Sequence, residues 1–340
     1  MKIQAIYFNH VGPIENQKFD FYDDWSDKIF SRVLFSGPNG SGKSLVLRAI
    51  AELWQATAYW LDNRDKLPHS NRKWLQQWGG IAIIFTELPE TSTPIGLVFG
   101  ESAWFKKLQE ELPDIQWMGE IKNTLLLPQK EWLNNWSESR NKLILNFETA
   151  KTPNMIYLDA EECRWVSPKR RVGRILQDYY KTRWLVKYQA TEDWQGQIEA
   201  SLINLKVTKL HQYHQMIREF NHFLYGKEIS PDIKPGGKTR LQVTIKGKRG
   251  QSHTIDVLSS GERQILIKLY LVNCLLKPGG LVMIDEPDHY LHPSLVSGFL
   301  ARLESHVEKH KGQLLISSHL PSVWSRYDTR DKLIELGDSL

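Results

Sequence analysis

The chain of 340 residues is poor in cysteine and has no long uninterrupted apolar run. Its two cysteines, Cys163 and Cys274, form no CxxC pair, which argues against a zinc ribbon or zinc hook. Such low cysteine content is typical of a reducing compartment, and we expect both thiols to be buried. No stretch approaches the roughly 18 apolar residues of a membrane span, and the first residues lack a signal-peptide pattern. We therefore expect a cytoplasmic protein without a membrane partner.

Internal repeats, low-complexity segments and a heptad run long enough for a coiled-coil arm are also missing from the sequence. The net charge is only +5, which is compatible with nucleic-acid contact but far from a histone-like balance. With 41% hydrophobic residues, the chain can bury the core of one large domain or two modest ones. Thirteen tryptophans predict extensive half-buried packing, with an exposed subset available for a protein interface.

Apolar segments bounded by turn residues predict a strand-rich first half of the chain. Residues 2–7 and 17–22 are expected to form one hairpin, and residues 81–85 and 95–99 a second. A helix is expected directly after the glycine-rich turn that follows residues 33–35. The predicted strands cover residues 2–7, 17–22, 33–35, 81–85, 95–99, 123–127, 142–147 and 155–158.

The pattern becomes helical after Arg164 and stays so from residue 172 to about 224. Trp184 and Trp194 in this stretch are candidate partner anchors, although core packing is the alternative role. A strand, a turn at 246–250 and a second strand follow, and then helices and apolar strands alternate to the end. These later elements are predicted at residues 241–245, 253–257, 262–276, 281–284, 294–303, 314–316 and 333–336.

The glycine-rich turn fits the pattern GxxxxGK[ST] and lies between a predicted strand and a predicted helix, which is the context that a phosphate loop requires. Its glycines let backbone N–H groups surround phosphates, the lysine supplies a charge for the β- and γ-phosphates, and the final serine can ligate Mg²⁺. We therefore expect ATP and Mg²⁺ as ligands. The loop consists of Gly37, Pro38, Asn39, Gly40, Ser41, Gly42, Lys43 and Ser44.

A second motif is the apolar strand at 281–284, which ends in Asp285 and Glu286. A continuous apolar run of this kind is typical of a strand buried on both faces of a parallel sheet. Carboxylates at its carboxyl end lie at the usual ligand edge of such a sheet. Asp285 is expected to hold Mg²⁺ and Glu286 to polarise the attacking water.

Three further segments complete a family pattern. Residues 258–264 read LSSGERQ and resemble the ABC signature, while residues 286–293 read EPDHYLHP and resemble the EPxxxLHP segment. Residues 316–321 resemble the switch-histidine strand and contain His319. In order and spacing, these motifs resemble those of ABC-type ATPases of the SMC-like, RecF-like and OLD kinds, including the broad AAA_21-type family. The resemblance covers both ends of the chain and says little about residues 60–240.

The resemblance implies an α/β fold, namely an ABC-type ATPase head with a phosphate-loop core sheet, an antiparallel β subdomain and a helical insert or lid. It implies an ATP hydrolase in which Lys43, Glu286 and His319 are catalytic. It also implies a homodimer that joins head to head, because in this family the signature binds the ATP held by the other subunit. Within one domain over 1–340, we expect an N-terminal lobe at 1–165, a helical insert at 166–235 and a C-terminal lobe at 236–340.

The signature residues that would reach the partner's nucleotide begin a predicted helix, whose free N–H groups suit a phosphate. A capped helix start is a compatible second interpretation, since a serine three residues before a glutamate is a capping-box pattern. The signature departs from the usual LSGGQ at its second serine, and the Q-loop glutamine has only Gln76 and Gln77 as candidates. The signature residues are Ser259, Ser260, Gly261 and Glu262.

Three roles remain open for such an ATPase. The first is a switch that controls a separately encoded effector, such as a nuclease, in bacterial anti-phage defence; about twenty residues after His319 leave no room for a TOPRIM nuclease. The second is a RecF-like DNA-binding repair clamp, which the basic residues at 169–174 and 246–249 favour. The alternative for these residues is a solvated surface without a ligand. The third, a transporter subunit, is disfavoured by the EPxxxLHP form.

Overall fold

The computed structural model describes residues 1–88, 91, 93–122, 124–161, 180–188, 192–233, 241–247, 251–328 and 331–337. Several predicted features lie outside these residues, and the structure therefore does not test them. They include Cys163, the basic residues at 169–174, Lys248, Arg249 and the side chain of Trp194.

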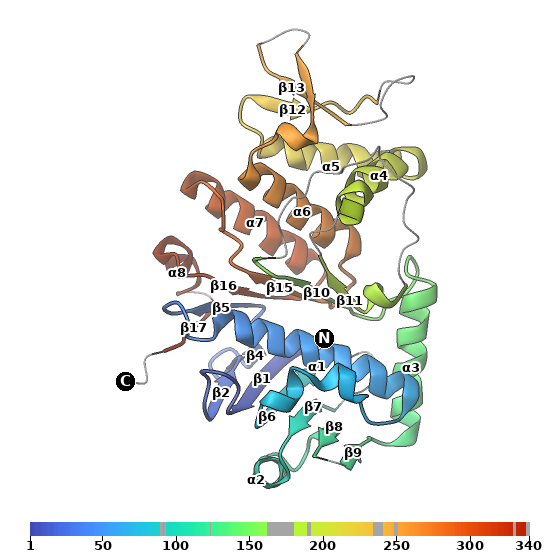
Figure 1. Ribbon diagram of the computed structural model, residues 1–340, viewed down its shortest axis with the longest axis vertical. Helices are drawn as coiled ribbons and strands as arrows, with labels where there is room; N and C mark the ends of the chain where they lie inside the picture. Colours follow the sequence, from blue (N-terminus) through green and yellow to red (C-terminus); the bar gives the residue numbers. More distant parts are fainter. Residues whose placement is uncertain are drawn as a thin grey trace.

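A six-stranded sheet with only parallel neighbours forms the centre of the fold (Figure 1). Its inner strands are mainly apolar, and β15 and β16 are buried at every residue, as strands covered on both faces must be. This confirms the predicted parallel sheet. In spatial order the strands are β11 (Leu185–Lys187), β10 (Met155–Leu158), β15 (Leu281–Asp285), β16 (Gln313–Ser317), β5 (Arg32–Ser36) and β17 (Lys332–Glu335).

A second six-stranded sheet lies below the first in Figure 1. Both predicted hairpins are confirmed here, because β1 pairs antiparallel with β2, and β6 pairs antiparallel with β7. The pair β7 and β8 is parallel, and helix α2 (Ser102–Glu111) connects the two strands. Neither α2 nor β8 was evident from the sequence. The spatial order is β2 (Gln17–Asp20), β1 (Lys2–Asn9), β6 (Gly80–Thr86), β7 (Ile95–Gly100), β8 (Gln116–Ile121) and β9 (Thr124–Leu126).

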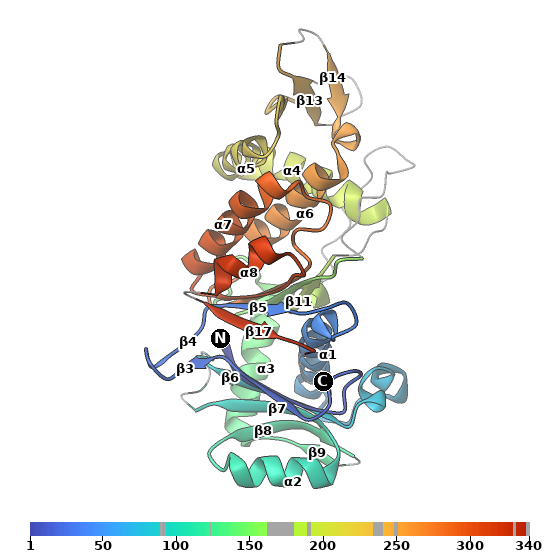
Figure 2. The ribbon, with the colours of Figure 1, turned by 90° about the vertical axis from the view of Figure 1, so that its left-hand side faces the viewer.

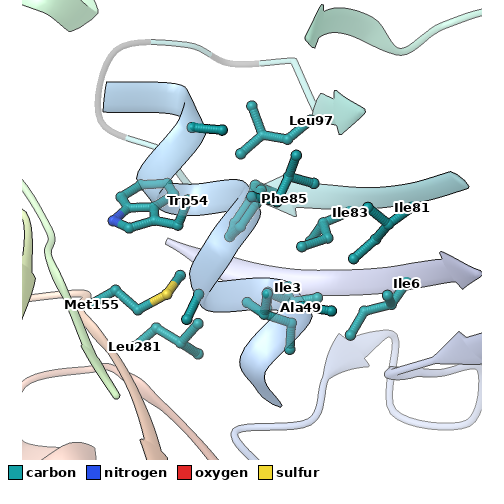
Figure 3. Close-up of a cluster of buried hydrophobic side chains, with 14 of the residues drawn as sticks. Ile3, Ile6, Ala49, Trp54, Ile81, Ile83, Phe85, Leu97, Met155 and Leu281 are labelled. Carbon is teal, nitrogen blue, oxygen red and sulfur yellow. The ribbon is translucent and has the colours of Figure 1, made fainter. Parts of the chain in front are cut away.

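Helix α1 (Lys43–Asn63) lies between the two sheets, and most of its residues are buried. Figure 3 shows Ala49 and Trp54 of this helix between Ile83 and Phe85 of the lower sheet and Met155 of the central sheet. Its buried residues make up most of the helix surface, and most of its partly or fully exposed residues form one stripe: Ser44, Arg48, Glu52, Gln55, Tyr59 and Asp62. The helix that begins at the phosphate loop is therefore held firmly from both sides.

Three helices cover the opposite face of the central sheet (Figures 1 and 2). They are α6 (Ser260–Leu275), α7 (Pro293–Lys309) and α8 (Pro321–Tyr327). Beyond them lie α4 (Glu192–Thr208), α5 (Leu210–His222) and a small sheet of β12 (Lys227–Ile229), β13 (Gln242–Ile245) and β14 (Ser252–Thr254). Across the described ranges, no helix is both long and apolar enough to cross a membrane.

The strand predicted at 142–147 is wrong, because residues 142–145 form the last turn of helix α3 (Lys130–Leu145). Trp132, Trp136 and Leu143 are buried on one face of this helix, and their spacing is helical. An ion pair between Lys142 and Glu138 joins neighbouring turns. The second strand predicted at 253–257 is also too long, since β14 ends at Thr254 and residues Ile255–Val257 form a 3-10 turn.

The remaining short elements connect these layers. They are β3 (Tyr22–Asp23), β4 (Lys28–Ile29) and the 3-10 turns η1 (His69–Arg72), η2 (Leu75–Gln77) and η3 (Tyr180–Arg183).

Cys274 in α6 is half-buried, and burial raises the pKa of its thiol to about 12. This thiol is therefore a poor nucleophile at neutral pH.

Tryptophans form the centre of the core where the residue before β11 meets α1. The Trp54 and Trp184 rings are stacked, with 4.2 Å between centroids and 4° between planes. Each indole N–H donates to the other residue's carbonyl oxygen at 3.1 Å. Trp184 is only 1% exposed, so of its two predicted roles the structure supports core packing.

Candidate nucleotide site

Four neighbouring parallel strands end at the same edge of the central sheet. Asp285 at the end of β15 is in register with Ser317 at the end of β16, and Ser317 is in register with Phe35 of β5. Leu158, the last residue of β10, is in register with Ile284. The segments that follow these strands therefore meet at the ligand edge of an open α/β sheet, where phosphate and metal sites occur.

The phosphate loop between β5 and α1 has a backbone that its glycines make possible. Gly37 has φ 138°, and a Cβ on it would lie 2.2 Å from the carbonyl oxygen of Leu336. At Gly40, with φ 84°, a Cβ would meet nothing within 4 Å, so this side of the loop is open. The loop packs against Leu336 on one side and is open on the side of Gly40, as binding of phosphate requires.

Helix α1 begins with two side chains that can bind ligands, namely Lys43, which can bind phosphate, and Ser44, whose hydroxyl can ligate Mg²⁺. The Lys43 ammonium donates to the carbonyl oxygens of Gly37 and Pro38, at 2.8 and 2.9 Å, so it lies folded over the loop. The Ser44 hydroxyl donates to Asp285 Oδ1 at 3.0 Å. The Ser41 hydroxyl is buried and has no hydrogen-bond partner among the described residues. A phosphate oxygen would satisfy the Ser41 hydroxyl, and the Lys43 ammonium lies where it could bind phosphate as well, so the loop fits the predicted ligand.

Asp285 is buried at the end of β15, where its charge is poorly solvated. Burial raises the pKa of its carboxyl, hydrogen bonds from Ser317 and Ser44 oppose the rise, and the charges of Asp159 and Glu286 add to it. A divalent cation would relieve this burial of negative charge. Within the described ranges, no group of three or more His, Cys, Asp and Glu side chains could hold a metal alone. The Asp285 carboxylate and the Ser44 hydroxyl fit Mg²⁺, which usually binds one or two carboxylates together with substrate phosphates and water.

Glu286 and His319 face each other at this edge. His319 Nδ1 lies 3.2 Å from Glu286 Oε1, and both side chains are partly exposed. Glu286 has φ 44°, a left-handed conformation that is uncommon for a residue with a side chain. Its backbone N–H donates to both the carbonyl oxygen and the hydroxyl of Ser317, at 3.2 and 3.1 Å. Such local strain is typical of functional loops, and here it accompanies the pairing of the two side chains.

Asp159 is an acidic residue at this edge that the sequence did not reveal. It follows β10, accepts hydrogen bonds from the Tyr157 hydroxyl and the Glu161 backbone N–H at 2.9 Å each, and acts on the charge of Asp285. The available signal was weak, namely an apolar strand that ends in an acid, as β15 does. Gln76 and Gln77, the candidates for the Q-loop, are exposed in the turn η2.

The signature segment forms the capped start of α6. The Ser259 hydroxyl accepts from the Glu262 N–H at 3.3 Å, and Glu262 accepts from the Ser259 N–H at 2.7 Å, which confirms the predicted capping box. Lys227 binds Glu262 at 2.8 Å. A Cβ at Gly261 would lie 2.5 Å from the Tyr290 carbonyl oxygen, so glycine permits the contact with the loop after β15.

The signature and the phosphate loop belong to opposite faces of the central sheet. Helix α6, which Ser259 caps, covers one face, whereas α1, which follows the phosphate loop, covers the other (Figure 1). The structure therefore brings together the phosphate loop, Asp285, Glu286 and His319. It leaves the four signature residues on a separate layer of the same chain.

Comparisons with known proteins show which chains are similar. The AAA_21 family model, described as "AAA domain, putative AbiEii toxin, Type IV TA system", matches residues 192–325. The "Lipoprotein-releasing system ATP-binding protein LolD" of Treponema denticola is 26% identical over 168 residues, which cover 47% of this chain and 69% of that protein.

Two solved structures are similar over most of their lengths. The "Crystal structure of the SmcHead bound to the C-winged helix domain of ScpA" has 12% identity and a TM-score of 0.47, over 98% of this chain and 94% of that chain. The "SMC head domain from Thermotoga maritima" has 15% identity and a TM-score of 0.40, over the same shares of the two chains.

Proposed function

We propose that this chain is an ABC/SMC-like AAA ATPase and acts as a nucleotide-driven switch that binds Mg·ATP and hydrolyses it. The observation that carries the proposal is the 3.0 Å hydrogen bond between Ser44 and Asp285. It joins the phosphate loop to the acidic strand end at the position where a phosphate-bound Mg²⁺ needs its protein ligands.

Each residue at the edge then has a role. Backbone N–H groups of 37–44 bind the phosphates, and Lys43 exchanges its contacts with Gly37 and Pro38 for phosphate oxygens. Ser44 and Asp285 hold Mg²⁺, which neutralises charge on the phosphates. Glu286 takes the proton of the attacking water, and His319 orients the Glu286 carboxylate, 3.2 Å away.

The signature motivates a dimer in this proposal. The capped start of α6 offers N–H groups suited to a γ-phosphate, yet α6 lies across the central sheet from α1. Two copies related by a two-fold axis would each place Ser259, Ser260 and Gly261 against the other's nucleotide. Each ATP would then be enclosed by two chains and would hold the dimer together.

The proposed cellular role is control of a separately encoded effector, such as a nuclease, in bacterial anti-phage defence in the cytoplasm. The words "toxin" and "TA system" in the description of the matching family model support this direction. An ATP-dependent change between one chain and two would give the effector a signal to read.

The enzymatic part of the proposal is tested by measuring ATP binding and phosphate release with purified protein. We expect hydrolysis in the presence of Mg²⁺, and we expect EDTA to abolish it. Without the metal, Ser44 and Asp285 have no positive charge with which to neutralise the phosphates. Lys43→Ala is expected to weaken ATP binding by about 100-fold, since it removes charge-assisted hydrogen bonds.

The control is Lys142→Ala, which changes an exposed lysine in an ion pair on α3, far along the chain from the loop. It should bind and hydrolyse ATP as the wild type does. Hydrolysis that persists in EDTA, or Lys43→Ala protein that binds ATP normally, would contradict the assignment of this site.

A further inference from the structure

Asp288 and Ser318 form a buried hydrogen bond that the roles proposed above do not use. The Ser318 hydroxyl donates to Asp288 Oδ1 at 2.8 Å, and both residues are almost completely inaccessible to solvent. Asp288 lies two residues after Glu286, and Ser318 directly precedes His319. The bond therefore joins the two loops that carry the paired side chains Glu286 and His319.

Every polar group of Ser318 makes a hydrogen bond. Its N–H donates to the Phe35 carbonyl oxygen at 3.1 Å, just before the phosphate loop. Its carbonyl oxygen accepts from the Trp324 indole at 3.0 Å, and its hydroxyl accepts from the Leu320 N–H at 3.1 Å. The residue before His319 is thus fixed to β5, to α8 and to the Asp288 loop at once.

Ser317 holds the other side of the same junction. Its hydroxyl donates to Asp285 and accepts from the Glu286 N–H. Successive serines therefore each bind one part of the acidic loop. The His319 ring, in contrast, has Glu286 as its one hydrogen-bond partner among the described residues. Because the ring is partly exposed and makes a single side-chain hydrogen bond, the position of His319 must depend on the backbone that Ser318 fixes.

We propose that Asp288 and Ser318 are positioning residues that keep His319 within hydrogen-bond distance of Glu286. This inference rests on the proposed ATPase function and adds to it the device that aligns the catalytic pair. A displacement of about 1 Å in such a pair can cost on the order of 100-fold in rate. The bond acts on the pair and leaves the contacts of the phosphate loop with ATP unchanged.

The test compares kcat and KM for ATP hydrolysis in variants of both residues. Ser318→Ala and Asp288→Ala are expected to lower kcat by roughly 10- to 100-fold with KM and ATP affinity changed by less than about twofold. Asp288→Asn keeps an acceptor for the serine hydroxyl and should stay within about threefold of wild type. The matched control is Ser325→Ala, because the exposed Ser325 hydroxyl donates to the Ser322 carbonyl oxygen of its own helix, away from the Glu286–His319 pair.

The decisive step repeats Ser318→Ala in a His319→Ala background. If Ser318 acts through His319, the second substitution should lower kcat no further, since groups that act as a unit are not additive. An equal loss in both backgrounds would overturn the positioning role, as would an Asp288→Asn variant as impaired as Asp288→Ala.

The outcomes also separate this inference from the function on which it rests. An impaired His319→Ala variant beside a fully active Ser318→Ala variant overturns the positioning role and leaves the ATPase intact. A wild-type chain that binds ATP without hydrolysing it overturns both.

Discussion

Replacing Glu286 with glutamine is expected to lower the rate of ATP hydrolysis by a factor of about 10²–10⁴ while ATP still binds. The amide keeps the size and the hydrogen-bonding reach of the side chain, but it cannot take a proton from water. The phosphate loop and the Ser44–Asp285 pair are untouched by this change, so the affinity for Mg·ATP should be retained. Steady-state phosphate release and equilibrium nucleotide binding measure the two quantities separately.

A matched control is Glu308→Gln, which makes the same change at an exposed residue of α7. It should leave both rate and affinity unchanged. Full activity of Glu286→Gln would show that another group activates the water. Asp159 would be the first to examine, because its charge already acts on Asp285.

Truncating Trp184 to alanine is expected to lower the free energy of unfolding by about 3–5 kcal/mol. The indole is buried at 1% exposure, stacks on Trp54 at 4.2 Å and takes part in both reciprocal hydrogen bonds. Its loss leaves a cavity between α1 and the core, and it leaves the Trp54 backbone carbonyl oxygen without its indole donor. Urea denaturation followed by circular dichroism measures the change.

Trp25→Ala provides the comparison for a tryptophan of the opposite kind. Trp25 is 97% exposed in the turn between β3 and β4, so its truncation should change stability by less than about 0.5 kcal/mol. If Trp184→Ala cost less than about 1 kcal/mol, the stacked pair would not be the stabilising link between the start of β11 and α1.

Predictions from the sequence were most reliable where local pattern and chemistry coincide. The strands at 33–35, 281–284 and 314–316 are short apolar runs, each ended by polar motif residues, and all three lie in the central sheet. Their motif residues meet at one edge because parallel neighbouring strands end together. For the same reason, the sequence could predict that Ser44, Asp285, Glu286 and His319 lie near one another, as they do in the structure.

Predictions from the sequence failed where long-range packing determines the secondary structure or the position of a residue. The apolar residues at 142–147 suit a strand as well as a helix, and only the burial of Leu143 with Trp132 and Trp136 selects the helix. The pairing of β11 with β10 depends on an insert whose local pattern is helical. Asp159 was missed because no motif marks it, and its place beside Asp285 follows from the register of β10 with β15.

The most direct test of the account is the mass in solution of the Glu286→Gln variant, measured by light scattering with and without Mg·ATP. Because this variant should bind ATP without consuming it, the closed dimer should accumulate. The account predicts one chain of 39.6 kDa without nucleotide and twice that mass with Mg·ATP. A variant that binds ATP and keeps the mass of one chain, or that is already a dimer without nucleotide, would contradict the proposed ATP-driven switch.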